Sequence, residues 1–375
     1  MFMAWRWKFE SIFSVAILMV AMLAVSAQLI SAQAVASSLP AGMTTYETVR
    51  VAEGVYGFIP PEDDTAFVSG NSVAILGDDG VLVVDSGHTP STTARMIAEI
   101  RRLTDKPVRF LVNTHWHPDH NAGNGLYREA YPGVEIVSTP ATRDAIRDLL
   151  PKKEVNEEMA EMVRKILKED STQKGKPLPA EVRKYYETSL AQLEAFFPEL
   201  RKSDHALPTV TFESRMTVYL GKREVQLIFL GRANTAGDAV IYVPDSKVLM
   251  TGDLVVYPVP YPYGSFLGEW IEAMKKLEAM DAAVIVPGHG PVMHDKRYID
   301  RVIALLDATR RQAADAFHRG LKPEEAIQAV DLSAFREQFV EHNPEREFVF
   351  DQGYKPAAVV RAYREAKDGP LHDED

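Results

Sequence analysis

Residues 115–120 of this chain read HWHPDH and constrain its fold more than any other segment. They follow the apolar run VRFLVNT at residues 108–114, which is typical of a buried strand. Histidine fills 10 of 375 positions, so three histidines within six residues rarely arise by chance. Imidazole and carboxylate groups suit zinc and similar divalent ions. The segment is therefore predicted to bind metal where this strand ends, with one pair of side chains facing one ion and another pair facing a second. The pairs are His115 with His117 and Asp119 with His120.

The surrounding chain alternates between short strand patterns and helical patterns. Strand patterns lie within residues 46–59 and 72–84, and Asp79-Gly80 between two apolar runs is typical of a hairpin turn. A second group of strand patterns begins at residue 208 and is followed by a helix and a further strand. Two halves of this kind predict an α+β fold in which two sheets pack face to face with helices outside.

Two segments stand outside this pattern. Residues 150–205 hold two charged, amphipathic helical patterns and are predicted to be a helical insertion. The insertion is either a lid or partner surface, or a solvated helical hairpin packed on the core. Residues 301–375 are predicted to be a C-terminal helical extension, which leaves residues 37–300 for the main domain.

Residues 1–36 have the order of a secretory signal peptide, with a basic start, an apolar stretch and small residues near the end. An uncleaved membrane anchor is the alternative. A signal peptide predicts a periplasmic or secreted protein that meets the membrane only through this segment. The absence of cysteine excludes disulfides and thiolate metal ligands. The formal net charge of −11 repels phosphate backbones, so we expect a small-molecule substrate and no nucleic acid.

Five short motifs occur in an order that resembles the metallo-β-lactamase superfamily. HWHPDH is one, and the others are VVDSG at 83–87, GRANTAGD at 231–238, TGD at 251–253 and PGHG at 287–290. The resemblance covers about residues 45–295 and implies the αββα sandwich of that superfamily. It also implies two metal sites joined by a bridging aspartate, and a further aspartate that orients ligands by hydrogen bonding. The first site would use His115, His117 and Asn234, the second Asp119, His120 and His289, with Asp253 as the bridge and Asp85 as the orienting residue.

Asn234 is where this chain departs from the pattern, because the superfamily has a histidine there. An amide oxygen is neutral and is a weaker ligand for zinc than imidazole. Three outcomes stay open: a weak ligand in a two-metal site, an empty first site with chemistry on the second metal, or a preference for manganese or iron. His88 and His294 are further candidates to replace the missing ligand, although a loop histidine more often faces solvent or caps a backbone group.

The resemblance implies a metal-dependent hydrolase, in which hydroxide on one or two zinc ions attacks an amide, lactone or ester-type bond, as in a β-lactamase. Asp119 or Asp253 would take up or orient the proton. An iron-dependent dioxygenase of the same fold and a metal-poor binding protein are the alternatives. The candidate substrate contacts are the aromatic residues Trp116, Tyr257, Tyr261 and Tyr263.

Overall fold

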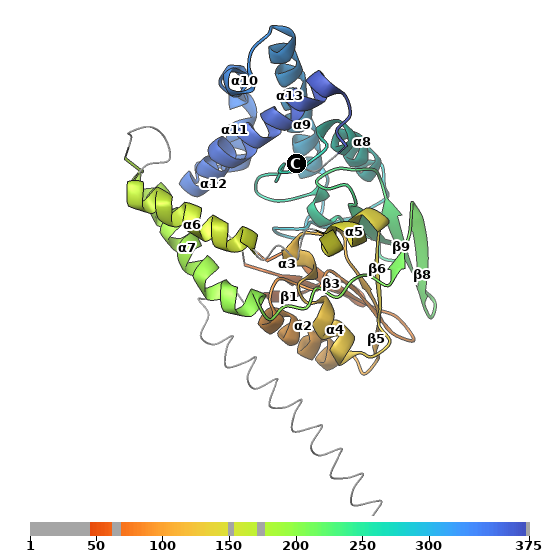
Figure 1. Cartoon of the computed structure of the whole chain (residues 1–375). Coiled ribbons are helices and arrows are strands. Elements are labelled where there is room, and N and C mark those ends of the chain that lie inside the picture. The colour runs from red at the N-terminus through yellow and green to blue at the C-terminus, as the bar shows by residue number, and fades with distance from the viewer. Residues whose placement is uncertain (1–45, 62–68, 149–153, 171–176, 373–375) are drawn as a thin grey trace, which may run out of the picture.

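The computed structural model describes residues 46–61, 69–148, 154–170 and 177–372, and the predicted signal peptide lies outside them. Two β-sheets pack face to face, with helices on the outer face of each (Figure 1). The predicted α+β sandwich is confirmed. Within the described residues, no helix combines the length and the hydropathy needed to cross a membrane.

The first sheet has seven strands that lie in chain order. The first four pair antiparallel, and the next three add to the edge in parallel. The predicted hairpin at Asp79-Gly80 joins the third and fourth strands. The strands are β1 (Glu47–Ala52), β2 (Val55–Ile59), β3 (Ser72–Leu76), β4 (Val81–Val84), β5 (Val108–Val112), β6 (Glu135–Ser138) and β7 (Val210–Thr211).

The second sheet has five strands in the order β12-β11-β10-β9-β8. Its β11 and β12 run parallel, with Met250 opposite Val286, so both strands end at the same edge. The strands are β8 (Arg215–Leu220), β9 (Arg223–Phe229), β10 (Ala239–Val243), β11 (Val248–Met250) and β12 (Val284–Val286).

The central strands of each sheet are apolar on both faces, because one face meets the other sheet and the opposite face meets helices. In β5, Val112 packs into the core between the sheets and the adjacent Leu111 packs toward the helices, as the two-residue period of a strand requires. On the second sheet, Trp270 anchors the outer helices and is fully buried. The helices on the first sheet are α2 (Pro90–Leu103), α3 (Pro118–Asn121), α4 (Asn124–Ala130) and α5 (Pro140–Asp148), and those on the second are α8 (Leu267–Glu278) and α9 (Arg297–His318).

Two helices lie within the predicted insertion, α6 (Glu154–Glu169) and α7 (Ala180–Leu200), and they pack against each other (Figure 1). Arg164 and Glu194 pair across them at 2.9 Å. The end of α7 is fixed to the sandwich by Glu199, which is buried. Its Oε2 accepts hydrogen bonds from the backbone N–H of Ser91 at 3.1 Å and from the Ser91 hydroxyl at 2.7 Å, at the start of α2.

The C-terminal helices pack on the second sheet's helical layer and share its core. Helix α9 runs through the predicted boundary between residues 300 and 301, and α13 lies along α9 (Figure 1). Phe339, Tyr354 and Val359 belong to the same apolar cluster as Trp270. The helices are α10 (Pro323–Ala329), α11 (Ser333–Val340), α12 (Pro344–Phe348), the π-helical turn η2 (Val349–Tyr354) and α13 (Lys355–Asp368).

We predict that Glu199→Ala lowers the free energy of unfolding by about 1–3 kcal/mol, because it leaves buried donors at the start of α2 without an acceptor. Urea denaturation measures the effect. Glu194→Ala, which removes the exposed partner of Arg164, is the control and is expected to cost less than about 1 kcal/mol. Equal losses in the two variants would contradict the role given to Glu199.

Candidate metal centre

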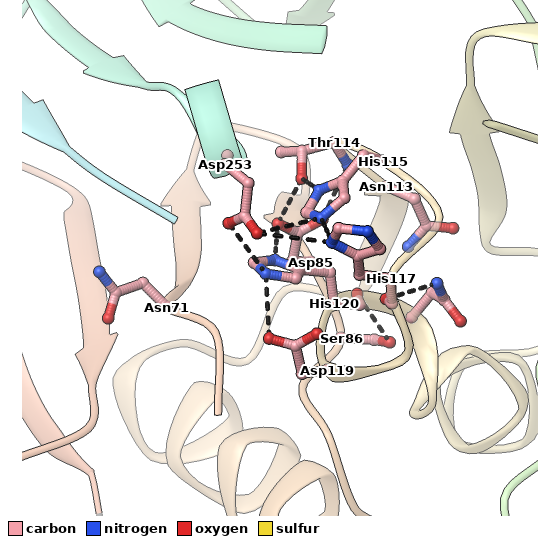
Figure 2. A network of polar contacts seen from close by, with 12 residues as sticks. Asn71, Asp85, Ser86, Asn113, Thr114, His115, His117, Asp119, His120 and Asp253 are labelled. Atoms are coloured by element: carbon pink, nitrogen blue, oxygen red, sulfur yellow. Dashed lines mark hydrogen bonds and ion pairs between the residues drawn. The ribbon is translucent and has the colours of Figure 1, made fainter. Parts of the chain in front are cut away.

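Five of the predicted ligands, His115, His117, Asp119, His120 and Asp253, gather at one edge of the sandwich, where strands of both sheets end (Figure 2). The HWHPDH segment leaves β5 and enters α3, which begins at Pro118. Asp253 lies in the short helix η1 (Gly252–Leu254) directly after β11, and His289 follows β12. Because these strands end at the same edge, residues far apart in the sequence meet in one cluster.

The first group consists of His115, His117 and Asp253. His115 Nε2 lies 2.9 Å from His117 Nδ1. Oδ2 of Asp253 lies 3.4 Å from His115 Nε2 and 3.6 Å from His117 Nδ1. These three atoms converge as ligands of one ion would.

The second group consists of Asp119, His120 and His289. Asp119 Oδ2 lies 3.2 Å from His120 Nε2 and 3.0 Å from His289 Nε2, and the two imidazole nitrogens are 3.3 Å apart. Oδ1 of Asp253 faces this group, at 3.3 Å from His120 and 3.5 Å from His289. Asp253 therefore turns one oxygen toward each group, as a bridging ligand does.

The chemistry of these donors fits divalent metal. Asp253 Oδ1 is buried and has no hydrogen-bond donor among the described residues, which is costly for a carboxylate unless a cation is near. Burial lowers the pKa of His115 to about 4, so this imidazole is neutral near pH 7, as a metal ligand must be. A Cβ atom at Gly288 would overlap Asp253 Oδ1, so glycine is required there for the PGHG loop to pass this close.

The cluster also needs positive charge beside its carboxylates. Burial opposes ionisation of Asp253, yet the neighbouring histidines outweigh it and hold the pKa of this carboxyl well below its ordinary value. Burial likewise opposes charge on His120, but the carboxylates around it, Asp119 first, hold its pKa well above the ordinary value. Divalent ions would supply this positive charge in place of protons.

Asp85 fixes the orientation of two of the histidines. Its Oδ2 accepts from Nδ1 of His120 at 2.8 Å and from the Thr114 hydroxyl at 2.8 Å, while its Oδ1 accepts from the Thr114 backbone N–H at 2.8 Å. The same hydroxyl lies 2.9 Å from Nδ1 of His115, which donates to it. Both imidazoles therefore carry their proton on Nδ1 and turn Nε2 toward the metal position.

Three supporting residues were not predicted from the sequence: Thr114, Asn121 and Asn71. Asn121 donates from Nδ2 to the carbonyls of Trp116 and His117, at 2.6 and 2.8 Å, and so holds the loop around His117. Asn71 donates from Nδ2 to the carbonyls of Pro287 and Gly290, both at 2.9 Å, on either side of His289. Thr114 and Asn121 directly flank the HWHPDH segment, and that adjacency is the signal that could have identified them.

Asn234 is fully buried in the loop between β9 and β10. Its Nδ2 donates to the carbonyl of Tyr261, and its Oδ1 is buried without a hydrogen-bond donor among the described residues. The loop itself is fixed, because the carbonyl of Gly237 accepts from the hydroxyls of Thr139 and Thr142 at 2.8 and 3.0 Å. A buried amide oxygen without a donor in the described chain, on a loop held in place, is consistent with a weak oxygen ligand. The role of Asn234 as a ligand stays a prediction.

The two additional histidine candidates differ in position. The pKa of His88 is lowered, first by burial, and the charges that act on it are those of Asp119, His120 and His289 in the second group. His294 is exposed. His88 is thus the candidate that interacts electrostatically with the second group, and its role as a ligand stays a prediction.

The four aromatic candidates also divide. The ring of Trp116 lies edge-on to His117, with centroids 4.8 Å apart. Tyr257 packs on Tyr298 at 5.4 Å, toward the C-terminal helices. Tyr261 and Tyr263 are 46% and 47% exposed, and Tyr261 lies edge-on to His117 at 5.9 Å. Trp116 and Tyr261 are therefore the aromatic side chains in ring contact with a ligand.

We predict that Asp85→Asn weakens zinc binding at the second group about 10- to 100-fold, because His120 Nδ1 loses its charged acceptor. Competition with a chromophoric chelator measures the affinity. Asparagine tolerates the positive φ of 57° at this position, which limits backbone strain. Asp79→Asn, which alters an exposed carboxylate paired with Arg109, is the control and should leave zinc affinity unchanged. Unaltered affinity in Asp85→Asn would refute the orienting role.

Comparison with known proteins agrees with this geometry. Residues 65–289, more than half of the chain, match the family model of the metallo-beta-lactamase superfamily. One relative, the linear primary-alkylsulfatase of Pseudomonas sp. (strain ATCC 19151), is 26% identical over 270 residues, which are 69% of this chain and 49% of the relative. The chain thus spans about half the length of that curated relative.

Solved structures of similar fold include a metallo-beta-lactamase from Pontibacter korlensis, with a TM-score of 0.49 and 20% identity over 70% of this chain and 99% of that one. DIM-1 metallo-beta-lactamase gives a TM-score of 0.47 and 16% identity over 70% of this chain and 97% of its own. The HWHPDH, GRANTAGD and TGD motifs all lie within the residues that match this family model. The chain belongs to the metallo-beta-lactamase superfamily.

Proposed function

We propose that this protein is a metal-dependent hydrolase that cleaves an ester-type bond of a small molecule. The observation that carries the proposal is the placement of Asp253. Its two carboxylate oxygens face two separate groups of ligands, and Oδ1 is buried without a hydrogen-bond donor among the described residues. In a protein that bound no metal, this buried carboxylate oxygen would lack a hydrogen-bond donor in the part of the chain that the structure describes, which is unfavourable.

The residues of the two groups would bind the metal, and two of them, Asp119 and Asp253, would also accept or orient a proton. A divalent ion bound here would lower the pKa of a water molecule and polarise the bond to be cleaved. Asp119 and Asp253 stay ionised, because the neighbouring histidines outweigh burial and hold the pKa of each carboxyl well below its ordinary value. Either carboxylate can therefore accept or orient the proton of the attacking water.

The nature of the bond rests on sequence similarity. The relative is named as an alkylsulfatase, and its match extends over 270 residues. That similarity favours an ester, a sulfate ester included, over a β-lactam amide. We therefore place ester-type substrates first, and β-lactams and lactones after them.

We also propose that the protein acts in a periplasm or outside the cell. The order of residues 1–36, with a basic start, an apolar stretch and small residues near the end, supports this location. N-terminal sequencing of the protein recovered from its native host tests it. A mature chain that lacks the first ~36 residues is expected, whereas a cytoplasmic protein that keeps them would refute export.

We predict that Asp119→Ala and His120→Ala each lower kcat/KM for a carboxyl or sulfate ester at least about a thousandfold, because each removes a ligand of the second group. Stopped assays with the zinc-loaded protein measure the loss, and a chelator should abolish activity in the unaltered protein. His318→Ala, an exposed position at the end of α9, is the control. Near-native turnover in either variant would refute the assignment, and activity that requires iron and oxygen would favour the dioxygenase alternative.

A further inference from the structure

Two exposed tyrosines stand beside the ligand cluster. Among the described residues, four large apolar side chains are about half exposed or more, and Tyr261 and Tyr263 are two of them. Exposed aromatic side chains that adjoin a site commonly mark ligand contacts. The rings of Tyr261 and Tyr263 lie 4.7 Å apart, and Tyr261 reaches His117 at 5.9 Å.

The loop that carries these tyrosines is held firmly, so their exposure does not come from a loose segment. The carbonyl of Tyr261 accepts from Asn234. The hydroxyl of Ser265 donates to the carbonyl of Pro262 at 2.7 Å. Arg361, a buried residue of α13, donates to the carbonyls of Ser265 and Gly264 at 2.7 and 3.1 Å. Rigid exposed rings bind a ligand at a low entropic cost.

Beyond Tyr263, half-buried aromatic side chains of the insertion and of the C-terminal helices lie close by. The Tyr263 hydroxyl lies 3.5 Å from the position that a Cβ atom of Gly353 in η2 would take. Helix α12 contacts both η2 and α7. Burial, followed by the neighbouring Tyr186 and Tyr263, raises the pKa of Tyr185 in α7 to about 12. The rings of Tyr185 and Tyr186 pack on Phe348 of α12 at 5.2 and 5.4 Å.

We propose that this aromatic strip, formed by Tyr261, Tyr263, Tyr185, Tyr186 and Phe348, binds an extended apolar chain of the substrate. The chain would lie along the strip while the reacting group lies at the metal ligands. This proposal rests on the proposed hydrolase function only for the substrate group that reacts at the metal ligands, and it adds the class of chain attached to that group. It assigns the substrate class as esters with a long alkyl or aryl chain, and it makes Tyr261 and Tyr263 specificity-determining residues.

Calorimetric titration of the zinc-loaded protein with methyl-, butyl- and octylphosphonate tests the proposal without any hydrolysis. The phosphonate group is a common anionic head, and only the chain length changes. We expect affinity to rise about two- to fourfold for each methylene between butyl and octyl, as burial of apolar surface predicts. Tyr261→Ala and Tyr263→Ala should each weaken octylphosphonate binding about tenfold and leave methylphosphonate binding unchanged.

Two matched variants control the experiment. Tyr219→Ala removes a tyrosine that is 59% exposed on β8, and it should bind octylphosphonate as the unaltered protein does. Tyr263→Phe keeps the ring and should retain the chain-length effect. Three results would each overturn the proposed binding strip: equal affinity for methylphosphonate and octylphosphonate, an unchanged chain-length effect in both alanine variants, or no binding of any phosphonate. If the protein shows the chain-length effect in binding but hydrolyses no ester, only the proposed reaction is refuted and the binding strip stands.

Discussion

The rest of the site depends on the buried negative charge of Asp253 and on the positive charge that balances it. It lies between two groups of ligands, and its Oδ1 has no hydrogen-bond donor in the described part of the chain. A buried charge is strongly unfavourable unless groups of opposite charge lie beside it. The neighbouring histidines outweigh burial and hold the pKa of the Asp253 carboxyl well below its ordinary value, although burial lowers the pKa of one of them, His115, to about 4. A divalent cation held by each group would supply this positive charge in place of protons, and the imidazole and carboxylate donors fit such an ion.

The fold serves this site by placing strand ends together. β11 and β12 run parallel and end side by side, which brings Asp253 next to His289. β4 and β5 do the same in the other sheet and bring Asp85 to the HWHPDH segment. Asp85 adopts a positive φ of 57° to do so, a conformation that aspartate tolerates better than most residues. The apolar core between the sheets keeps both strand pairs in register.

The sequence correctly predicts that six side chains come together, because four of them lie within six residues and the other two sit in short motifs at strand ends. Their role as metal ligands stays a prediction. The sequence predicts the supporting residues poorly. Asn71 reaches the PGHG loop across 216 positions, and Glu199 reaches α2 across 108. Contacts of that range depend on tertiary packing and leave no periodic pattern. Hydropathy alone also cannot separate the packed Tyr257 from the exposed Tyr261, since both lie in one aromatic, proline-rich segment.

The metal content of the purified mature protein, measured by elemental analysis, tests the central claim most directly. The two ligand groups joined by Asp253 predict two divalent ions per chain, which would make Asn234 a tolerated weak ligand of the first. One ion per chain would contradict the two-metal account and leave the chemistry to Asp119, His120 and His289. No bound metal would contradict the metal centre altogether.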